Sequence, residues 1–354
     1  MKYSALARIR RKNRAVLLCM AAAVAIMTCV CLFVGSARLT VRECLAALLG
    51  RGSDAQLRIL RSIRLPRVLS AVLAGAGLSL SGLIMQTTLN NSMASPSTLG
   101  VSNAAVFGAN LSLLAFAGDA FASGQNAEAY LASANPFAVG AMALLFSALS
   151  ILLILGLCRL RSFSPGVVVL AGVAMGAMWT AGTTVLQFYA TDVGLSAAVI
   201  WSFGDLGRAT FRTDAILFAV VAAGLLFFLA MAWRYNALLS GEAAARAMGV
   251  RVERLRFVSL LLASVITAVC VSFLGVIGFV GIICPHVTKR LLGQDHRVSI
   301  PASALCGSLL LLLADTLSRS LGNGSALPVG AITSLLGAPF FLAILFSRRE
   351  GQEE

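Results

Sequence analysis

Apolar segments about as long as a membrane span alternate with short polar segments along almost the whole chain of 354 residues. Read in windows of about 19 residues, this pattern predicts ten membrane helices. They cover residues 15–35, 67–88, 97–117, 136–158, 165–188, 213–233, 255–274, 276–292, 299–318 and 328–347. Residues 276–292 form a short, glycine-rich segment interrupted by Pro285, which fits a half-helix as well as a full span.

Composition supports this interpretation. Hydrophobic residues make up 59% of the chain and charged residues 12%. A soluble domain of this size could not bury so much apolar surface in one core, so lipid has to cover part of it. We therefore expect an all-α polytopic membrane protein with a transmembrane domain over residues 15–347, a basic cytoplasmic N-terminus (1–14) and a short cytoplasmic tail (348–354).

The N-terminus also has features of a signal peptide, because the basic run RIRRKNR precedes an apolar stretch that ends in small residues. That apolar stretch is about 20 residues long, whereas the apolar region of a signal peptide has about 7–15. The length favours a first membrane helix.

Positive residues predict the orientation, since they are retained on the cytoplasmic side. With ten spans and the N-terminus inside, the inner segments hold 18 of the 28 Lys and Arg residues. The outer segment 114–135 carries Asp119 and Glu128 and no Lys or Arg. Both termini are therefore expected in the cytoplasm.

One predicted outer loop, between the first two helices, is strongly basic. It contains Arg38, Arg42, Arg51, Arg58, Arg61, Arg64 and Arg67. Long loops are translocated regardless of charge, which is one explanation. The other is an acidic partner outside the cell, since a charged patch steers a complementary surface and sets its register.

Motifs for nucleotide or metal chemistry are missing from the sequence. A phosphate-binding loop needs lysine after glycine, and none of the three lysines follows a glycine. His286 and His296 have Asp295 and Cys284 as their only nearby candidate co-ligands, a poor metal set, so a structural or capping role is expected for His286. We expect no catalytic, cofactor-binding or metal-binding residue, and no cofactor.

The driving force for transport is expected to come from another subunit. An ion-coupled carrier usually keeps acidic residues inside its helices, and the candidate here is Asp315, near the outer end of the ninth predicted helix. An ion-coupled secondary transporter and a membrane-embedded enzyme are the alternatives. The first lacks buried carboxylates at membrane depth, and the second lacks a visible cluster of nucleophile, base or metal ligands.

Small residues in the second predicted helix indicate close helix packing. Ala71, Gly75, Ser79 and Leu83 recur at every fourth position, with Gly77, Ser81 and Gly82 beside them. Such a surface lets a neighbouring helix approach closely, and packing explains it better than contact with a ligand.

Seven motifs resemble those of one transporter family in order and spacing. They are RLPRVLSAVLAGAGLSLSGLIMQ (64–86), SPSTLGVSNAAVFGA (95–109), LAGVAMG (170–176), GEAAARAMGV (241–250), GVIGFVGIICPHVTKRLLGQDHR (275–297), LLLADTLSRS (311–320) and LPVGAITSLLGAPFFLAIL (327–345). The chain resembles the FecCD family, the permease subunits of ABC importers for iron siderophores, haem and cobalamin.

The resemblance implies a type II ABC importer permease bundle of about ten transmembrane helices in the plasma (inner) membrane. It implies a dimer with a second copy or a paralogue, with the transport path at the dimer interface. It also implies two ABC ATPase subunits on the inside, an extracytoplasmic substrate-binding protein, and no nucleic acid. A ferric siderophore is the expected cargo, with haem or cobalamin as the alternative.

Three functional regions follow from the resemblance. In the family, arginines of the RLPR motif and one beyond the AD motif face outward and receive glutamates of the binding protein. By motif these are Arg64, Arg67 and Arg319.

The second region is residues 236–253, which is too polar to cross lipid and rich in helix formers. Composition predicts a short helix on the cytoplasmic face, with an ordinary loop as the alternative. The resemblance makes it the coupling helix pair that fits a groove on the ATPase. The matching positions are Gly241, Glu242, Ala245, Arg246 and Gly249.

The third region is the cytoplasmic gate, formed in relatives by two turns. Here they contain Asn91 and Met93, and Ser164, Pro165 and Gly166. The usual Asn-Pro-Leu-Ala pattern is replaced by Asn91-Ser92-Met93-Ala94, so we expect a less rigid first turn.

Overall fold

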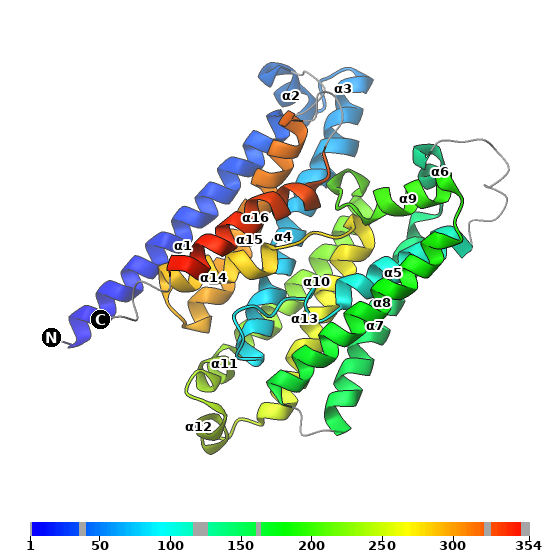
Figure 1. The fold of residues 1–354 in the computed structure, drawn as a ribbon. Helices are drawn as coiled ribbons and strands as arrows, with labels where there is room; N and C mark the ends of the chain where they lie inside the picture. The colour runs from blue at the N-terminus through cyan, green and yellow to red at the C-terminus, as the bar shows by residue number, and fades with distance from the viewer. Residues whose placement is uncertain (1, 35–39, 116–126, 161–163, 322–326, 348–354) are drawn as a thin grey trace.

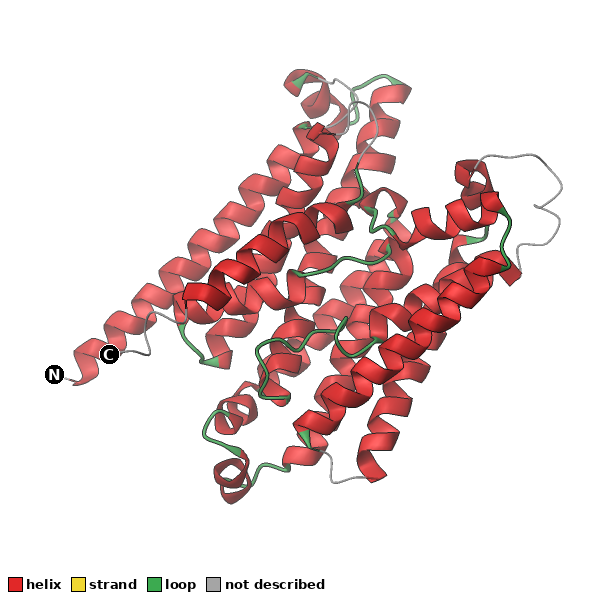
Figure 2. Cartoon of the chain, viewed as in Figure 1, coloured by secondary structure: helices red, strands yellow, loops and turns green. Residues whose placement is uncertain are grey.

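The computed structural model describes residues 2–34, 40–115, 127–160, 164–321 and 327–347. In this part of the chain helices are joined by loops, and two segments meet in a single isolated β-bridge, between Phe203 and Val276 (Figure 2). The helices are α1 (Lys2–Phe33), α2 (Val41–Leu48), α3 (Asp54–Arg58), η1 (Ile59–Arg64), α4 (Leu65–Thr88), α5 (Val101–Ala115), α6 (Ala127–Ser133), α7 (Pro136–Leu160), α8 (Pro165–Phe188), α9 (Asp192–Ser202), η3 (Leu206–Arg208), α10 (Phe211–Ala230), α11 (Ala232–Leu238), α12 (Glu242–Ala247), α13 (Val252–Leu274), α14 (Val280–Leu292), α15 (His296–Leu321) and α16 (Val329–Ser347).

The long helices run side by side between two ends of the bundle (Figure 1). We call the end that carries α2 and α3 the outer end, and the end that carries α11 and α12 the inner end, following the orientation that the sequence predicts. The beginning of α1 and the end of α16 both lie toward the inner end (Figure 1). Odd and even spans therefore alternate in direction, as a polytopic chain requires.

Each of the ten predicted spans contains a helix. Seven helices of the described chain are long and apolar enough to cross a bilayer, and α5 and α16 are shorter apolar helices. The segment predicted as 276–292 contains α14, which has only 13 residues, or about 20 Å of helix. The half-helix interpretation is therefore the correct one. The hydropathy pattern missed α9, an apolar helix of 11 residues.

The predicted outer loop is largely helical. Ser53 and Gln56 form a capping box that starts α3, and α3, η1 and α4 join into one continuous helix of 35 residues. At about 1.5 Å per residue this helix is about 52 Å long, whereas a hydrocarbon core is about 30 Å thick. Its first turns therefore extend beyond the bilayer and raise the basic segment above the membrane.

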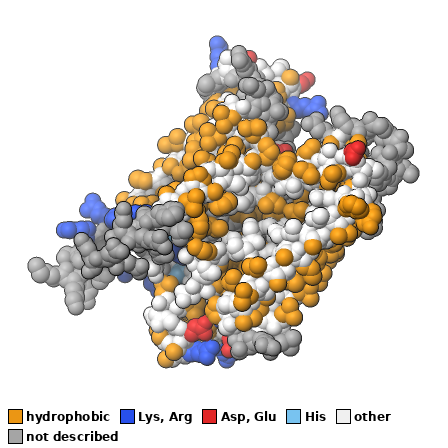
Figure 3. All heavy atoms as spheres, viewed as in Figure 1, with side chains coloured by type: hydrophobic (Ala, Val, Ile, Leu, Met, Phe, Trp, Pro, Cys, Tyr) orange, Lys and Arg blue, Asp and Glu red, His pale blue; other side chains and the backbone are white. Residues whose placement is uncertain are grey.

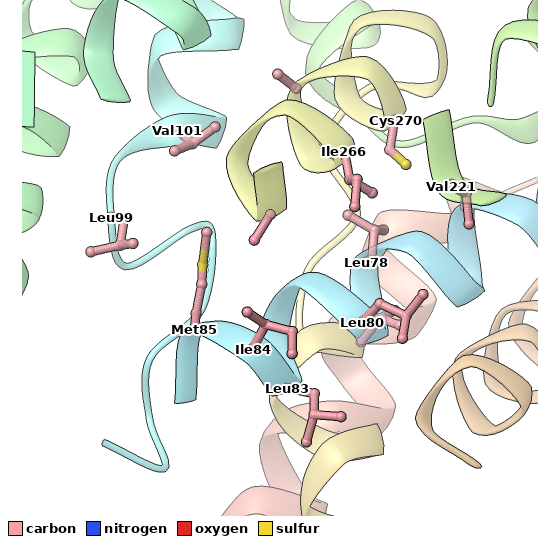
Figure 4. Packing of buried hydrophobic residues seen from close by; sticks show 14 of the residues in the cluster. Leu78, Leu80, Leu83, Ile84, Met85, Leu99, Val101, Val221, Ile266 and Cys270 are labelled. Carbon is pink, nitrogen blue, oxygen red and sulfur yellow. The ribbon is translucent and has the colours of Figure 1, made fainter. Parts of the chain in front are cut away.

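Helix α4 lies at the centre of the bundle. Its side chains Leu78, Leu80 and Ile84 pack in one cluster with Ile266 of α13 and Val221 of α10 (Figure 4). Over the apolar window of the long helix that contains α4, 78% of the residues are buried. The bundle is therefore packed around α4.

The small residues of α4 permit this packing, as the sequence predicts. A Cβ atom on Gly82 would lie 1.8 Å from the carbonyl oxygen of Gly281 in α14. One on Gly75 would lie 2.3 Å from the carbonyl oxygen of Gly307 in α15. Both helices touch α4 backbone to backbone, so a side chain at either glycine would push them apart.

The glycines of the GVIGFVG motif explain why α14 begins halfway through the bundle. The amide of Asp205 donates to the Leu274 carbonyl (2.8 Å), and the amide of Val329 donates to the Gly204 carbonyl (2.7 Å). Three non-helical segments thus cross just before α14. Phe279, the residue before the helix, has a left-handed backbone (φ 64°), which is strained for a residue with a side chain.

The surface agrees with a membrane location. Hydrophobic side chains cover the middle of the visible face, and Lys, Arg, Asp and Glu gather near its ends (Figure 3). Large apolar residues such as Leu170, Phe218 and Leu335 are 72%, 62% and 71% exposed. Lipid or a second subunit must cover this belt.

Candidate functional site: the two ends of the bundle

Two of the three predicted docking arginines bind the end of α1. Arg64 Nη1 donates to the carbonyl of Leu32 (2.7 Å), and Arg319 Nη1 donates to the carbonyls of Cys31 (3.1 Å) and Val34 (2.6 Å). The last carbonyls of a helix lack partners within the helix and carry partial negative charge. These guanidinium groups therefore fix the outer end of the first helix against η1 and α15.

The third arginine completes a buried ion cluster. Arg67 Nε lies 2.7 Å from Asp315 Oδ1, and Arg319 Nη2 lies 2.9 Å from Asp315 Oδ2. The Asp315 side chain is fully buried, and those of Arg67 and Arg319 are 10% and 5% exposed. In this structure α1 and Asp315 hold the three side chains, which are largely buried. A role in docking stays a prediction.

Other arginines at the outer end do face solvent. They are Arg42 on α2, Arg51 in the turn before α3, Arg58 on α3 and Arg61 on η1. We call these four residues the exposed arginine set. Two carboxylates, Glu43 and Asp54, lie in the same segment, and hydrogen bonds from the backbone and hydroxyl of Thr40 lower the pKa of Glu43.

Two short helices form at the inner end, where the sequence predicts a coupling helix. α11 and α12 are separated by Gly241, which has φ 97° and begins α12. Ala245 is fully buried, and Gly249 has φ 82° just after the helix. The two positive φ values explain why glycine brackets α12, since other residues rarely adopt this backbone.

Charged residues link α12 to the centre of the bundle. Glu242 pairs with Arg256 of α13, and Arg256 Nε donates to the carbonyl of Thr88 (2.9 Å), the last residue of α4. Arg246 lies 3.7 Å from Glu242 and 3.6 Å from Glu253, and its side chain is 58% exposed. The Glu242–Arg256–Thr88 chain, buried at Arg256 and Thr88 and partly exposed at Glu242, is a connection that the sequence did not reveal.

A second connection runs through His296. Its backbone amide and Nδ1 contact Asn236 Oδ1 of α11 at 2.8 and 2.9 Å, and its Nε2 lies 2.8 Å from Thr87 Oγ1. Asn236 also donates to Asp295 at 2.7 Å. Movement of α11 would therefore reach both α4 and the beginning of α15.

The two predicted gate turns lie at the inner ends of α4 and α8. Asn90 has a left-handed backbone (φ 44°), and Asn91 Oδ1 accepts a hydrogen bond from the Met93 amide (2.9 Å). Met93 is 45% exposed. In the second turn Ser164 accepts a hydrogen bond from the amide of Val167, and Pro165 begins α8.

No neighbouring atom lies within 4 Å of a Cβ built on Gly166, so this side of the second turn is open. The first turn is ordered by the Asn91 side chain.

Two aspartates, Asp214 and Asp315, are buried in the described chain, one more than the sequence predicts. Asp214, in the first turn of α10, is 4% exposed and accepts a hydrogen bond from Ser70. Asp214 and Asp315 both lie near the outer end, and Asp315 is paired with two arginines. Within the described residues no group of three or more His, Cys, Asp or Glu side chains could hold a metal ion.

The comparison with known families agrees with these features. The FecCD transport family matches residues 23–347. The chain belongs to the FecCD transport family. It is 44% identical over 315 residues to a protein of Methanocaldococcus jannaschii named as an ABC transporter permease, covering 89% of each chain.

Other relatives carry different cargo names. A hemin transport system permease protein of Yersinia pestis is 35% identical and covers 84% of this FecCD chain and 86% of its own. A cobalamin import system permease protein of Halobacterium salinarum is also 35% identical, with 82% and 74% coverage. Equal identity to both shows that overall similarity does not select the cargo.

A solved structure has the same fold. It is described as an inward-facing conformation of a metal-chelate type ABC transporter, and it superposes with a TM-score of 0.79 at 26% identity, covering 94% of this chain and 99% of its own. This FecCD protein is therefore a permease subunit of an ABC importer of the iron-chelate, haem or cobalamin class. ATP is hydrolysed by separate subunits.

Proposed function

We propose that this permease forms half of a dimeric import pathway for ferric siderophores in the plasma (inner) membrane, with both termini in the cytoplasm. The observation that supports the dimer best is the position of α4. Because α4 is buried at the centre of a packed bundle, cargo has to pass between two subunits rather than through one. The exposed apolar faces of α8 and α16 offer surface for a second copy or a paralogue.

We propose that α11 and α12 receive the motion of the ATPase subunits. The Glu242–Arg256–Thr88 chain would carry this motion to the end of α4, directly before Asn91 and Met93. A polar link between a surface helix and a gate turn is what a two-state element needs. Gly241, Ala245 and Gly249 set the backbone and the packing of α12, and Arg246 offers an exposed charge to the partner.

The outer end would receive the substrate-binding protein. The predicted orientation would put this end outside the cell, and its exposed arginine set gives it a positive surface. We propose that Arg64, Arg67 and Arg319 support this surface from below and add to its positive potential, since their charge exceeds that of Asp315. Acidic residues on the binding protein would complete the contact.

Uptake of labelled cargo tests the choice of substrate. Iron-starved cells with and without this gene would be given labelled iron as a hydroxamate chelate, a catecholate chelate or haem, and labelled cobalamin in parallel. We expect the loss of one siderophore form. Loss of haem or cobalamin uptake alone would replace the siderophore with that cargo, which the identities to relatives also allow.

A further inference from the structure

A polar cavity of about 570 Å³ lies at the inner end of the bundle. It is enclosed by the end of α4, the turn that follows it, the end of α11 and the second half of α14. Asn90, Ser92, Arg290 and Gln294 at its edge are exposed, so the cavity opens toward the inner side. Two of the motifs quoted above, 64–86 and 275–297, and the predicted gate residue Asn91 contribute to its lining, but the roles assigned to them do not explain a polar cavity.

The charge of the lining is one-sided. Lys289 and Arg290 both line the cavity, and no Asp or Glu does so among the described residues. Lys289 Nζ donates to Gln86 Oε1 (3.1 Å), which is a neutral amide. The neighbouring carboxylate in the sequence, Asp295, is already bonded to Asn236 (2.7 Å) and to the amide of Arg297 (3.0 Å).

The remaining polar groups suit an anion as well. Amide side chains of Asn91 and Gln294 line the cavity and supply N–H donors, whereas the Thr87 hydroxyl, which also lines it, already donates to the Leu83 carbonyl (3.0 Å). A partly buried ammonium group that has only neutral partners is costly, and a bound anion would offset this cost with charge-assisted hydrogen bonds. A cation or an apolar ligand would find neither a carboxylate nor a mainly apolar lining.

We propose that this cavity is an oxyanion site that binds a carboxylate or phosphate group through Lys289 and Arg290. Its occupant would touch the predicted gate turn at Asn91, as well as α11 and α14. Binding would therefore favour the conformation in which the gate turn and α11 lie close to Lys289 and Arg290 of α14. Three sources carry such a group, a small free anion, a carboxylate-bearing cargo on its way out and a lipid headgroup, and the chemistry is the same in each.

Direct binding to the purified full-length protein tests the site. The protein would be placed in nanodiscs of phosphatidylcholine and titrated with citrate and with inorganic phosphate, by calorimetry, at constant ionic strength set with chloride. We expect saturable binding of at least one of them. Lys289→Gln should weaken it at least about tenfold, because a charge-assisted bond contributes about 1.5–3 kcal/mol.

Matched variants separate a site from general charge. Lys289→Arg should retain binding within a few-fold, since the positive charge remains. Arg297→Gln removes a cation that is exposed at the same end and does not line the cavity, and it should bind as the unchanged protein does. If Lys289→Gln does not elute as folded protein, Arg290→Gln at the exposed edge makes the same test.

The pattern of binding identifies the source of the group. Tighter binding of citrate supports a carboxylate ligand, tighter binding of phosphate supports a phosphate ligand, and competition by phosphatidylglycerol in the nanodisc supports a headgroup. Absence of saturable binding to folded protein, or equal affinity in Lys289→Gln, would overturn the proposal. Transport does not enter this measurement, so failure here leaves the proposed import function untouched.

Discussion

At the scale of single residues, the arginines of the RLPR motif show how far sequence reasoning reaches. The motif and the family resemblance find Arg64, Arg67 and Arg319, and the structure brings all three to one place. The sequence could not show their burial, because the contacts join distant parts of the chain. Asp315 is more than two hundred residues from Arg67, and the end of α1 is more than two hundred residues from Arg319. Arginines that look like free surface charges in the sequence form ion pairs and hydrogen bonds between helices in the structure.

The ion cluster predicts an asymmetric response to substitution. Asp315→Asn removes the charge that Arg67 and Arg319 share, and breaking a buried pair typically costs about 3–5 kcal/mol. We expect a marked fall in folded protein after detergent extraction, measured by fluorescence-detected size exclusion after heating. Asp54→Asn, an exposed carboxylate at the same end, should cost less than about 1 kcal/mol. Equal behaviour of the two variants would contradict the structural role of Asp315.

Glycine positions allow a second test at this scale. Gly82→Ala places a Cβ on the Gly281 carbonyl, so α4 and α14 have to separate, and overpacking of this kind costs about 1–3 kcal/mol or more. Gly156→Ala is the control, because nothing lies within 4 Å of its Cβ position and alanine is the better helix former. We expect the first variant to lower the midpoint of thermal unfolding and the second to leave or raise it. The reverse order would show that the two helices do not pack this closely.

At the scale of elements, hydropathy predicts the long helices well, and it fails where length or polarity changes. Predicted spans 165–188 and 136–158 match α8 and α7 almost residue for residue. α9 was missed because a helix of 11 residues falls short of a span. The helical outer segment was missed because its basic residues resemble a loop, although capping boxes at Thr40 and Glu43 and at Ser53 and Gln56 indicate two helix starts.

The link between α12 and α4 predicts a separation of function at the inner end. Glu242→Gln breaks the ion pair with Arg256 and should reduce the stimulation of ATPase activity by loaded binding protein at least about fivefold, which corresponds to about 1 kcal/mol of coupling. The measurement is ATP hydrolysis by the assembled complex, with basal activity and assembly recorded alongside.

Glu253→Gln is the matched control for this link. Glu253 is 73% exposed, lies in the first turn of α13 and pairs only at 3.6 Å with Arg246. Glu253→Gln should therefore leave the stimulation of ATPase activity by loaded binding protein nearly unchanged. A loss of stimulation as large as that in Glu242→Gln would mean that the surface charge of the region matters, rather than the chain through Arg256 to Thr88.

At the scale of the whole molecule, the two ends are expected to serve different partners. The outer end offers an exposed arginine set, and the inner end offers two short helices tied to the central helix. Fold and family were accessible from sequence, because they depend on patterns repeated over many residues, and the orientation stays a prediction. The cavity at Lys289 was not, because it forms where four separate segments meet.

The docking surface can be tested by charge removal. Replacing Arg42, Arg51, Arg58 and Arg61 together by Gln should weaken association with the binding protein about thirtyfold, taking about 0.5 kcal/mol for each exposed pair. The loss should shrink as salt is raised, because exposed charges are screened. Surface binding assays with folded protein at two salt concentrations make this measurement. Unchanged affinity would assign docking to Arg64, Arg67 and Arg319 instead.

The central claim is that cargo moves through this permease at the expense of ATP hydrolysed by partner subunits. The most direct measurement is uptake of labelled cargo into proteoliposomes that contain the permease, its ATPase and loaded binding protein, with a hydrolysis-deficient ATPase as control. We predict uptake that requires ATP and hydrolysis and is unaffected by ionophores that collapse proton and sodium gradients. Uptake that persists with the inactive ATPase and disappears with an ionophore would contradict the account and identify an ion-coupled transporter.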